Sequence, residues 1–145
     1  MRINTSRFGT LDLLENELFN FPAGLIGLES LKVWSMVPDP TSESVAWLQS
    51  VSRASQAVAV ISPRAFVPGY RASISSRDLA LLGLRSDDRV YVVSTISGNA
   101  GRITTNLQAP ILINLDRRVG IQVVATDQQP LRYALEVPYQ QRLAA

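Results

Sequence analysis

Residues 90–107, with the sequence VYVVSTISGNAGRITTNL, carry the pattern that decides the fold. β-branched and aromatic residues fill positions 90–96, a turn signal follows at residues 98–101, and a second such run occupies positions 103–107. Two runs of this kind around a glycine-containing turn are typical of a β-hairpin whose loop is longer than two residues. The stretch therefore predicts two antiparallel strands.

The strand pattern continues on the C-terminal side of this hairpin. Apolar side chains recur at every second position in residues 111–115 and again in residues 121–125, with a turn signal at residues 116–118 between them. Since successive strand residues point to opposite faces, the alternation predicts two antiparallel neighbours with one buried face. Residues 57–61, AVAVI, are apolar throughout, which predicts a short strand covered on both faces.

One short helix interrupts the strands. Ser75 stands three positions before Asp78, as in an N-terminal capping motif, and leucines follow until Gly83 supplies a C-terminal stop. Residues 11–21 leave two alternatives open. Leucines at positions 11, 14 and 18 suit a helix, whereas leucines at positions 11 and 13 around an aspartate suit a strand.

The composition limits the possible chemistry. The chain has 145 residues and a net charge of +2, with no linker-like stretch and no internal repeat, so we expect one domain over residues 1–145. It contains no cysteine and no histidine. Disulfides, thiolate metal sites, cysteine nucleophiles and histidine bases are therefore excluded. We expect no catalytic residue, no metal and no cofactor.

Two other functions are alternatives to a non-catalytic protein that binds proteins. An enzyme could use paired carboxylates, but Asp87 and Asp88 are adjacent and read as a solvated turn, while Glu15 and Glu17 would share one strand face without any sign of a cleft. A nucleic-acid-binding β-barrel would need clustered basic residues. The cations are one lysine and thirteen arginines scattered along the chain, of which only residues 117–118 are adjacent.

The chain ends and the hydropathy indicate the compartment. The N-terminus lacks the apolar region of a secretory signal, and no apolar run approaches the roughly 18 residues that a membrane-spanning helix needs. We expect a cytoplasmic protein with protein partners, no membrane contact and no small-molecule substrate.

Several residues are candidates for contacting a partner. Tryptophan is enriched at binding hot spots, although a core position beside a strand is the stronger reading for Trp47. An asparagine within an apolar strand either meets a buried backbone group or points toward a partner. Apolar residues in the loop around Pro68 and Gly69 are either exposed for recognition or packed beneath the loop. The candidates are Phe66, Val67, Tyr70, Trp47, Asn106 and Asn114.

Four local strings, taken in order, resemble one known family. The first is FPAGLIGLESL at residues 21–31, and the second is WLQS at residues 47–50, followed by the apolar run 57–61, Pro63 and Tyr70. The third is TNLQAPILIN at residues 105–114, followed by GIQVV at residues 120–124. The fourth is a tail of Pro130, Arg132 and Leu135. Together the strings are similar to those of the flagellar assembly factor FliW family and cover nearly the whole chain.

The resemblance implies an all-β fold in which two antiparallel sheets form a small, partly open barrel, to which the residue pattern adds one short helix. It implies that residues 11–21 form two strands with a turn at residues 15–17. It also implies a non-catalytic cytoplasmic regulator that binds flagellin and the translational repressor CsrA, and so couples flagellin synthesis to export.

The chain departs from that family in charge. Family members are usually acidic, whereas this chain is basic, and Gly69 and Arg71 flank Tyr70 where acidic neighbours are common. Ser62 precedes Pro63 where an acidic or amide residue is frequent, and residue 129 is glutamine rather than tyrosine. Either the repressor has changed its charge in parallel or this chain binds flagellin alone.

Overall fold

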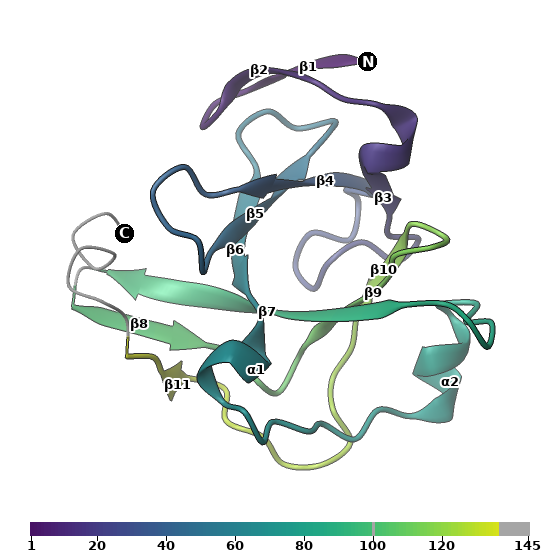
Figure 1. Cartoon of the computed structure of the whole chain (residues 1–145), viewed down its shortest axis with the longest axis vertical. Helices are drawn as coiled ribbons and strands as arrows, with labels where there is room; N and C mark the ends of the chain where they lie inside the picture. The colour runs from purple at the N-terminus through teal and green to yellow at the C-terminus, as the bar shows by residue number, and fades with distance from the viewer. Residues whose placement is uncertain (100, 137–145) are drawn as a thin grey trace.

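The computed structural model describes residues 1–99 and 101–136. Seven strands in this part of the chain close into a barrel in the order β3–β4–β5–β6–β7–β9–β10, and β10 returns to β3 (Figure 1). The predicted all-β barrel is therefore confirmed. Its strands are β3 (Leu18–Asn20), β4 (Val33–Pro38), β5 (Ala46–Ser50), β6 (Ala57–Ile61), β7 (Val90–Asn99), β9 (Ile111–Asn114) and β10 (Val119–Gln122).

The barrel is weakest where β3 meets β10. This contact is parallel and consists of the single pair Val119–Asn20, whereas every other strand pair of the ring is antiparallel. Arg118 reinforces it. The guanidinium of Arg118 lies 3.7 Å from the ring centroid of Phe19, and its Nε donates a 3.2 Å hydrogen bond to the carbonyl of Leu18. The backbone of Arg118 has a left-handed φ of 58°, which aims the side chain back at β3.

Two hairpins extend from this ring. The first, β1 (Arg2–Thr5) with β2 (Gly9–Asp12), forms a separate two-stranded sheet. The second joins β7 to β8 (Arg102–Thr105), and β11 (Tyr133–Ala134) pairs with the far side of β8. The predicted turn at residues 98–101 is shorter than expected because Asn99 already pairs with Arg102. Residue 100 lies outside the described residues. Gly98 permits this close pairing, since a side chain there would collide with the backbone of Arg102.

The helices partly match expectation. In α2 (Ser76–Ala80) the hydroxyl of Ser75 accepts a 3.1 Å hydrogen bond from the backbone N–H of Asp78, as predicted. The helix ends at Ala80, earlier than predicted, and a turn leads to Gly83, which has a left-handed φ of 59°. A further helix, α1 (Pro63–Phe66), was not predicted, although proline at its first position favours one. Residues 11–21 form the end of β2, a 3-10 turn η1 (Glu15–Glu17) and β3, as the resemblance implied.

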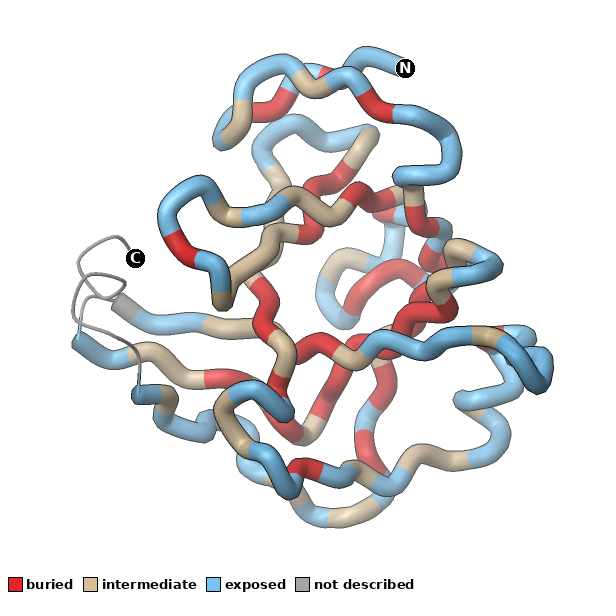
Figure 2. The backbone as a smooth tube through the Cα atoms, viewed as in Figure 1, coloured by how far each residue is buried: buried red, intermediate tan, exposed pale blue. Residues whose placement is uncertain are grey.

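The core has two clusters of buried side chains, one inside the barrel and one outside it. Figure 2 marks the buried positions along the backbone. All four residues of β9 are buried, so the expectation of a single buried face is wrong for this strand. Its second face is covered because Leu82, after α2, packs on Leu112. The inner cluster comprises Phe19, Phe21, Leu25, Leu31, Trp34, Leu48, Val60, Val93, Ile111 and Ile113, and the outer one Leu82, Leu112, Ile121 and Val123.

Strand β6 is less buried than the sequence predicts. Its last two residues, Val60 and Ile61, are buried, but residues 57–59 are only half-buried. The predicted coverage of both faces is therefore wrong for the first part of β6. An open recess lies against this part of β6.

Candidate functional site

A recess of about 560 Å³ lies against β6, between the β4–β5 loop and the β7–β8 hairpin. These two segments extend to the same side of the barrel in Figure 1. We call this recess the Trp47 groove. Its apolar lining includes Trp47, Ala59, Ile61, Phe66, Ile96 and Ile103.

Trp47 is held in one orientation by three neighbours from outside β5. Its indole Nε1 donates a 2.8 Å hydrogen bond to Oδ2 of Asp39. The guanidinium of Arg7 lies 4.0 Å from the centroid of the ring, and the ring of Phe8 packs edge-on at 6.2 Å. Both residues come from the tip of the β1–β2 hairpin. The tryptophan is half-buried and lines the groove, so it is not the core tryptophan that the sequence favoured; that position belongs to Trp34, which is fully buried.

Asp39 also organises the loop above the groove. Its Oδ1 accepts hydrogen bonds from the backbone N–H of Thr41 at 2.9 Å, from the Thr41 hydroxyl at 2.9 Å and from the N–H of Ser42 at 3.0 Å. Burial alone would raise the pKa of Asp39, but the hydrogen bonds from Trp47, Thr41 and Ser42 outweigh it and hold the pKa below its usual value. The groove is therefore bordered by a loop that is already fixed.

The structure separates the residues of the 66–70 loop. Phe66 lines the Trp47 groove, and Val67 is half-buried beside it in sequence. Tyr70 is 5% exposed, and its hydroxyl donates a 2.7 Å hydrogen bond to the carbonyl of Leu107. Burial, together with the charge of Asp127, raises the pKa of Tyr70 to about 12. The sequence left open whether Tyr70 is exposed or packed beneath the loop. The structure shows that it is packed beneath the loop, so the exposed alternative is wrong for this residue.

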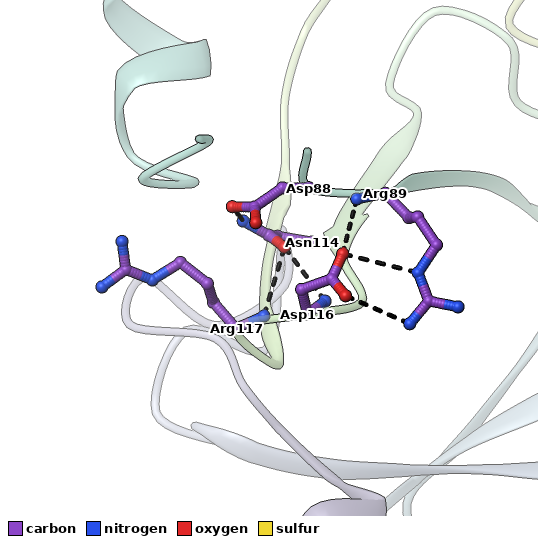
Figure 3. Close-up of polar contacts among 5 residues, drawn as sticks. All are labelled: Asp88, Arg89, Asn114, Asp116 and Arg117. Atoms are coloured by element: carbon purple, nitrogen blue, oxygen red, sulfur yellow. Dashed lines mark hydrogen bonds and ion pairs between the residues drawn. The ribbon is translucent and has the colours of Figure 1, made fainter. Parts of the chain in front are cut away.

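Asn114 is fully buried at the end of β9 and uses both ends of its amide (Figure 3). Its Nδ2 donates to the carbonyl of Leu82 at 3.1 Å and to Oδ2 of Asp88 at 3.0 Å. Its Oδ1 accepts from the backbone N–H groups of Asp116 at 3.1 Å and Arg117 at 3.2 Å. The sequence offered two alternatives for Asn114, a contact with backbone groups or a contact with a partner. The structure supports the first. Asn114 is not on an accessible surface.

Asn106 is half-buried and also fixes a turn. Its Oδ1 accepts from the backbone N–H groups of Gln108 at 2.9 Å and Ala109 at 3.1 Å. It lines a separate cavity of about 510 Å³. Of the sequence candidates, the fold thus brings Trp47 and Phe66 together in one groove, and it places Asn106, Asn114 and Tyr70 elsewhere.

Three of the charged residues noted in the sequence, Asp88, Arg117 and Arg118, contact other parts of the same chain. Hydrogen bonds from Asn114 and from the N–H of Arg85 lower the pKa of Asp88, which marks it as part of a turn. The adjacent arginines also contact protein groups, since Arg117 donates to the carbonyl of Gly83 and Arg118 covers Phe19. Within residues 1–99 and 101–136, no cluster of three acidic side chains is placed to hold a metal ion, and no helix is long and apolar enough to cross a membrane.

Comparison with known proteins identifies the family. A crystal structure of the flagellar assembly factor FliW superposes with a TM-score of 0.87 at 25% identity, over 94% of this chain and 98% of that one. The family model described as "FliW protein" matches residues 2–135. The chain belongs to the FliW family.

Individual FliW sequences agree with this assignment. The flagellar assembly factor FliW of Bdellovibrio bacteriovorus is 34% identical over 146 residues, which cover 99% of this chain and 83% of the relative. The FliW of Moorella thermoacetica is 36% identical over 127 residues, covering 86% of this chain and 80% of the relative. These names describe an assembly factor rather than an enzyme.

The sequence alone missed three residues that contact Trp47 in this FliW chain. Arg7 and Phe8 lie in the β1–β2 hairpin, far from Trp47 in sequence, whereas Asp39 lies in the loop that leads into β5. The Pro38-Asp39-Pro40 string signals a turn, and a side chain that accepts hydrogen bonds from its own loop is common there. Nothing in the sequence pattern indicates that the same carboxylate also meets a tryptophan.

Proposed function

We propose that this chain binds flagellin and the translational repressor CsrA in the cytoplasm, without catalysis, and couples flagellin synthesis to flagellin export. Membership of a family of flagellar assembly factors supports the proposal. The observation that carries it is the Trp47 groove. An apolar recess whose tryptophan and loop are already ordered loses little conformational entropy on binding, which suits it to protein recognition.

The coupling follows from shared binding equilibria. If flagellin and the repressor each change the affinity of this protein for the other, then accumulation of flagellin leaves more repressor free to act. Export of flagellin reverses the shift. The protein acts only through the amounts of the two complexes, so no chemical step is needed.

Calorimetric titration of the purified protein with folded, monomeric flagellin from the same organism tests the proposal. We expect saturable binding near one to one, which persists at high salt. Trp47→Ala should weaken binding at least about tenfold, as expected for an interface hot spot. Leu81→Ala is the matched control, because Leu81, which directly follows α2, is 61% exposed and does not line the groove. Absence of heat and of co-elution would refute flagellin binding, and the same titration with the repressor tests the second partner.

A further inference from the structure

The Trp47 groove is an apolar surface with balanced charge. Trp47, Phe66 and Ile96 line it and are only half-buried. The charged residues of its lining are Arg7 and Asp39, whose charges are opposite. A charged group that entered the groove would lose water without gaining a free partner, whereas an uncharged apolar segment would not. The lining therefore suits an uncharged apolar segment.

One wall of the groove is a face of the sheet formed by β7, β8 and β11. Gly98 pairs with Ile103, and the N–H of Leu135, the residue after β11, donates a 2.9 Å hydrogen bond to the carbonyl of Ile103. Residues directly opposite each other share a face of a sheet, and all three line the groove. Leu135 is half-buried, and Glu136 after it is exposed. The last apolar side chain before residue 137 thus lies on the groove wall.

The sequence after Leu135 continues the same alternation. Leu135, Val137 and Tyr139 are apolar or aromatic, and Glu136 and Pro138 stand between them. Since residues two apart in an extended chain share a face, the pattern predicts Val137 and Tyr139 on the side of Leu135. Pro138 favours this conformation, because the residue before a proline is biased toward extended backbone.

The segment 137–145, which lies outside the described residues, has the reach and the charge to cover the groove. An extended segment of nine residues spans up to about 30 Å, about the diameter of a small domain, so it can turn back from the β7–β8 hairpin toward the β4–β5 loop. Residues 137–141 carry no charge, which matches the balanced lining. Pro138 has no N–H, so fewer backbone donors need a partner when the segment leaves water.

We infer that residues 137–145 of the same chain cover the Trp47 groove, with Val137 and Tyr139 against its apolar lining, and that a binding partner displaces them. Covering removes apolar surface of the groove and of the segment from water. It lowers the apparent affinity for a partner, because only uncovered molecules can bind. The displacement by flagellin rests on the proposed function, whereas the covering of the groove depends on no partner.

Disulfide trapping in the full chain tests the covering. The chain has no cysteine, so an engineered pair supplies its only thiols. Ser44→Cys, in the lining of the groove, is combined with Gln140→Cys, and the control pair joins Gln140→Cys to Ser76→Cys at an exposed position of α2 outside the groove. A disulfide needs Cα atoms within about 7 Å, so we expect the first pair to form an intramolecular disulfide at least about tenfold faster than the control. Adding Tyr139→Ser to the first pair should remove this advantage.

Titration with flagellin tests the displacement. For a groove that is covered in about nine of ten molecules, Tyr139→Ser should bind flagellin about tenfold more tightly than the wild type. Gln140→Ser is the matched control, because residue 140 is adjacent in sequence but falls on the other face of the alternation, and it should bind as the wild type does. Circular dichroism confirms that each variant is folded.

Three results would overturn the inference. They are equal trapping rates for the two cysteine pairs, an affinity for flagellin that Tyr139→Ser leaves unchanged, and a disulfide that joins two molecules, which would assign the groove to the segment of a second copy. Fast trapping of the first pair without flagellin binding by any variant would refute flagellin binding instead, and the covering of the groove would stand.

Discussion

The hydroxyl of Tyr70 lies 2.7 Å from the carbonyl oxygen of Leu107, to which it donates a buried hydrogen bond. Leu107 follows β8, and Tyr70 closes the loop after α1, so this bond ties the segment that carries Phe66 to the barrel. A second hydrogen bond joins α1 to the end of this loop, since the Nε of Arg64 donates to the backbone carbonyl of Tyr70. The position of Phe66 in the groove therefore depends on a residue that does not line it.

Removal of this hydroxyl should destabilise the protein. In Tyr70→Phe the Leu107 carbonyl loses its side-chain donor, so we expect the free energy of unfolding to fall by about 1–2 kcal/mol. Urea denaturation at neutral pH measures the change. An unfolding midpoint equal to that of the wild type would contradict the assignment of a structural role to the bond.

The same residue should make the protein sensitive to alkali. The pKa of Tyr70 is raised to about 12 in the folded protein, against about 10 in an unfolded chain. The neutral phenol is thus favoured by folding, so its contribution is complete below about pH 10 and is lost as pH rises toward 12. We expect the stability of the wild type to fall over this range relative to Tyr70→Phe, as measured by urea denaturation at each pH. Parallel curves for the two proteins would refute it.

Asn114 should matter more to stability than Asn106. Asn114→Ala removes four hydrogen bonds at a fully buried position, and we expect a loss of at least about 3 kcal/mol. Asn106→Ala removes two at a half-buried turn, with an expected loss of about 1 kcal/mol. Urea denaturation of the two variants makes the comparison, and losses of equal size would show that burial does not set the difference.

Gly120 is required by its neighbour rather than by its backbone angles. A side-chain carbon at this position would fall inside van der Waals contact of the Phe21 ring, which is fully buried and cannot move away. We expect Gly120→Ala to cost about 1–3 kcal/mol of stability. Gly69→Ala is the matched control, because open space surrounds Gly69, and thermal denaturation should show it unchanged or slightly more stable.

The strands could be predicted from the sequence because their signals are local. The alternation in residues 111–115 and 121–125 predicted β9 and β10 as antiparallel neighbours, and Ser75 predicted the start of α2, which ends at Ala80 rather than at Gly83. The burial of both faces of β9 could not be predicted in the same way. It depends on Leu82 reaching Leu112, and a pairing between such distant residues leaves no periodic trace in one sequence.

The candidate site was less accessible to prediction for the same reason. Residue type alone identified Trp47 and Phe66, but the groove between them exists because the β1–β2 hairpin and the Asp39 loop meet the outer face of the barrel. An asparagine in an apolar strand has two readings of similar weight, and only its contacts decide between them. The four hydrogen bonds of Asn114 do so.

Asp39 should give the groove a dependence on acid pH. Hydrogen bonds from Trp47, Thr41 and Ser42 outweigh the effect of burial and lower the pKa of Asp39 in the folded protein. A lowered pKa means that the carboxylate favours folding above the unfolded value of about 3.9, and that this contribution is lost as pH falls below that value. We expect Trp47 fluorescence to stay constant between about pH 7 and 5 and to change below about pH 4.

Asp39→Asn separates this effect from that of the other carboxylates. An amide that keeps its oxygen toward Thr41 and Ser42 presents its NH₂ to the indole N–H of Trp47, where two donors cannot bond. The variant should therefore show altered Trp47 fluorescence at neutral pH and weaker flagellin binding, and it should lack the change below pH 4. Glu43→Gln, an exposed substitution in the same loop, should behave as the wild type. An acid transition that persists in Asp39→Asn would assign it to a carboxylate outside the groove.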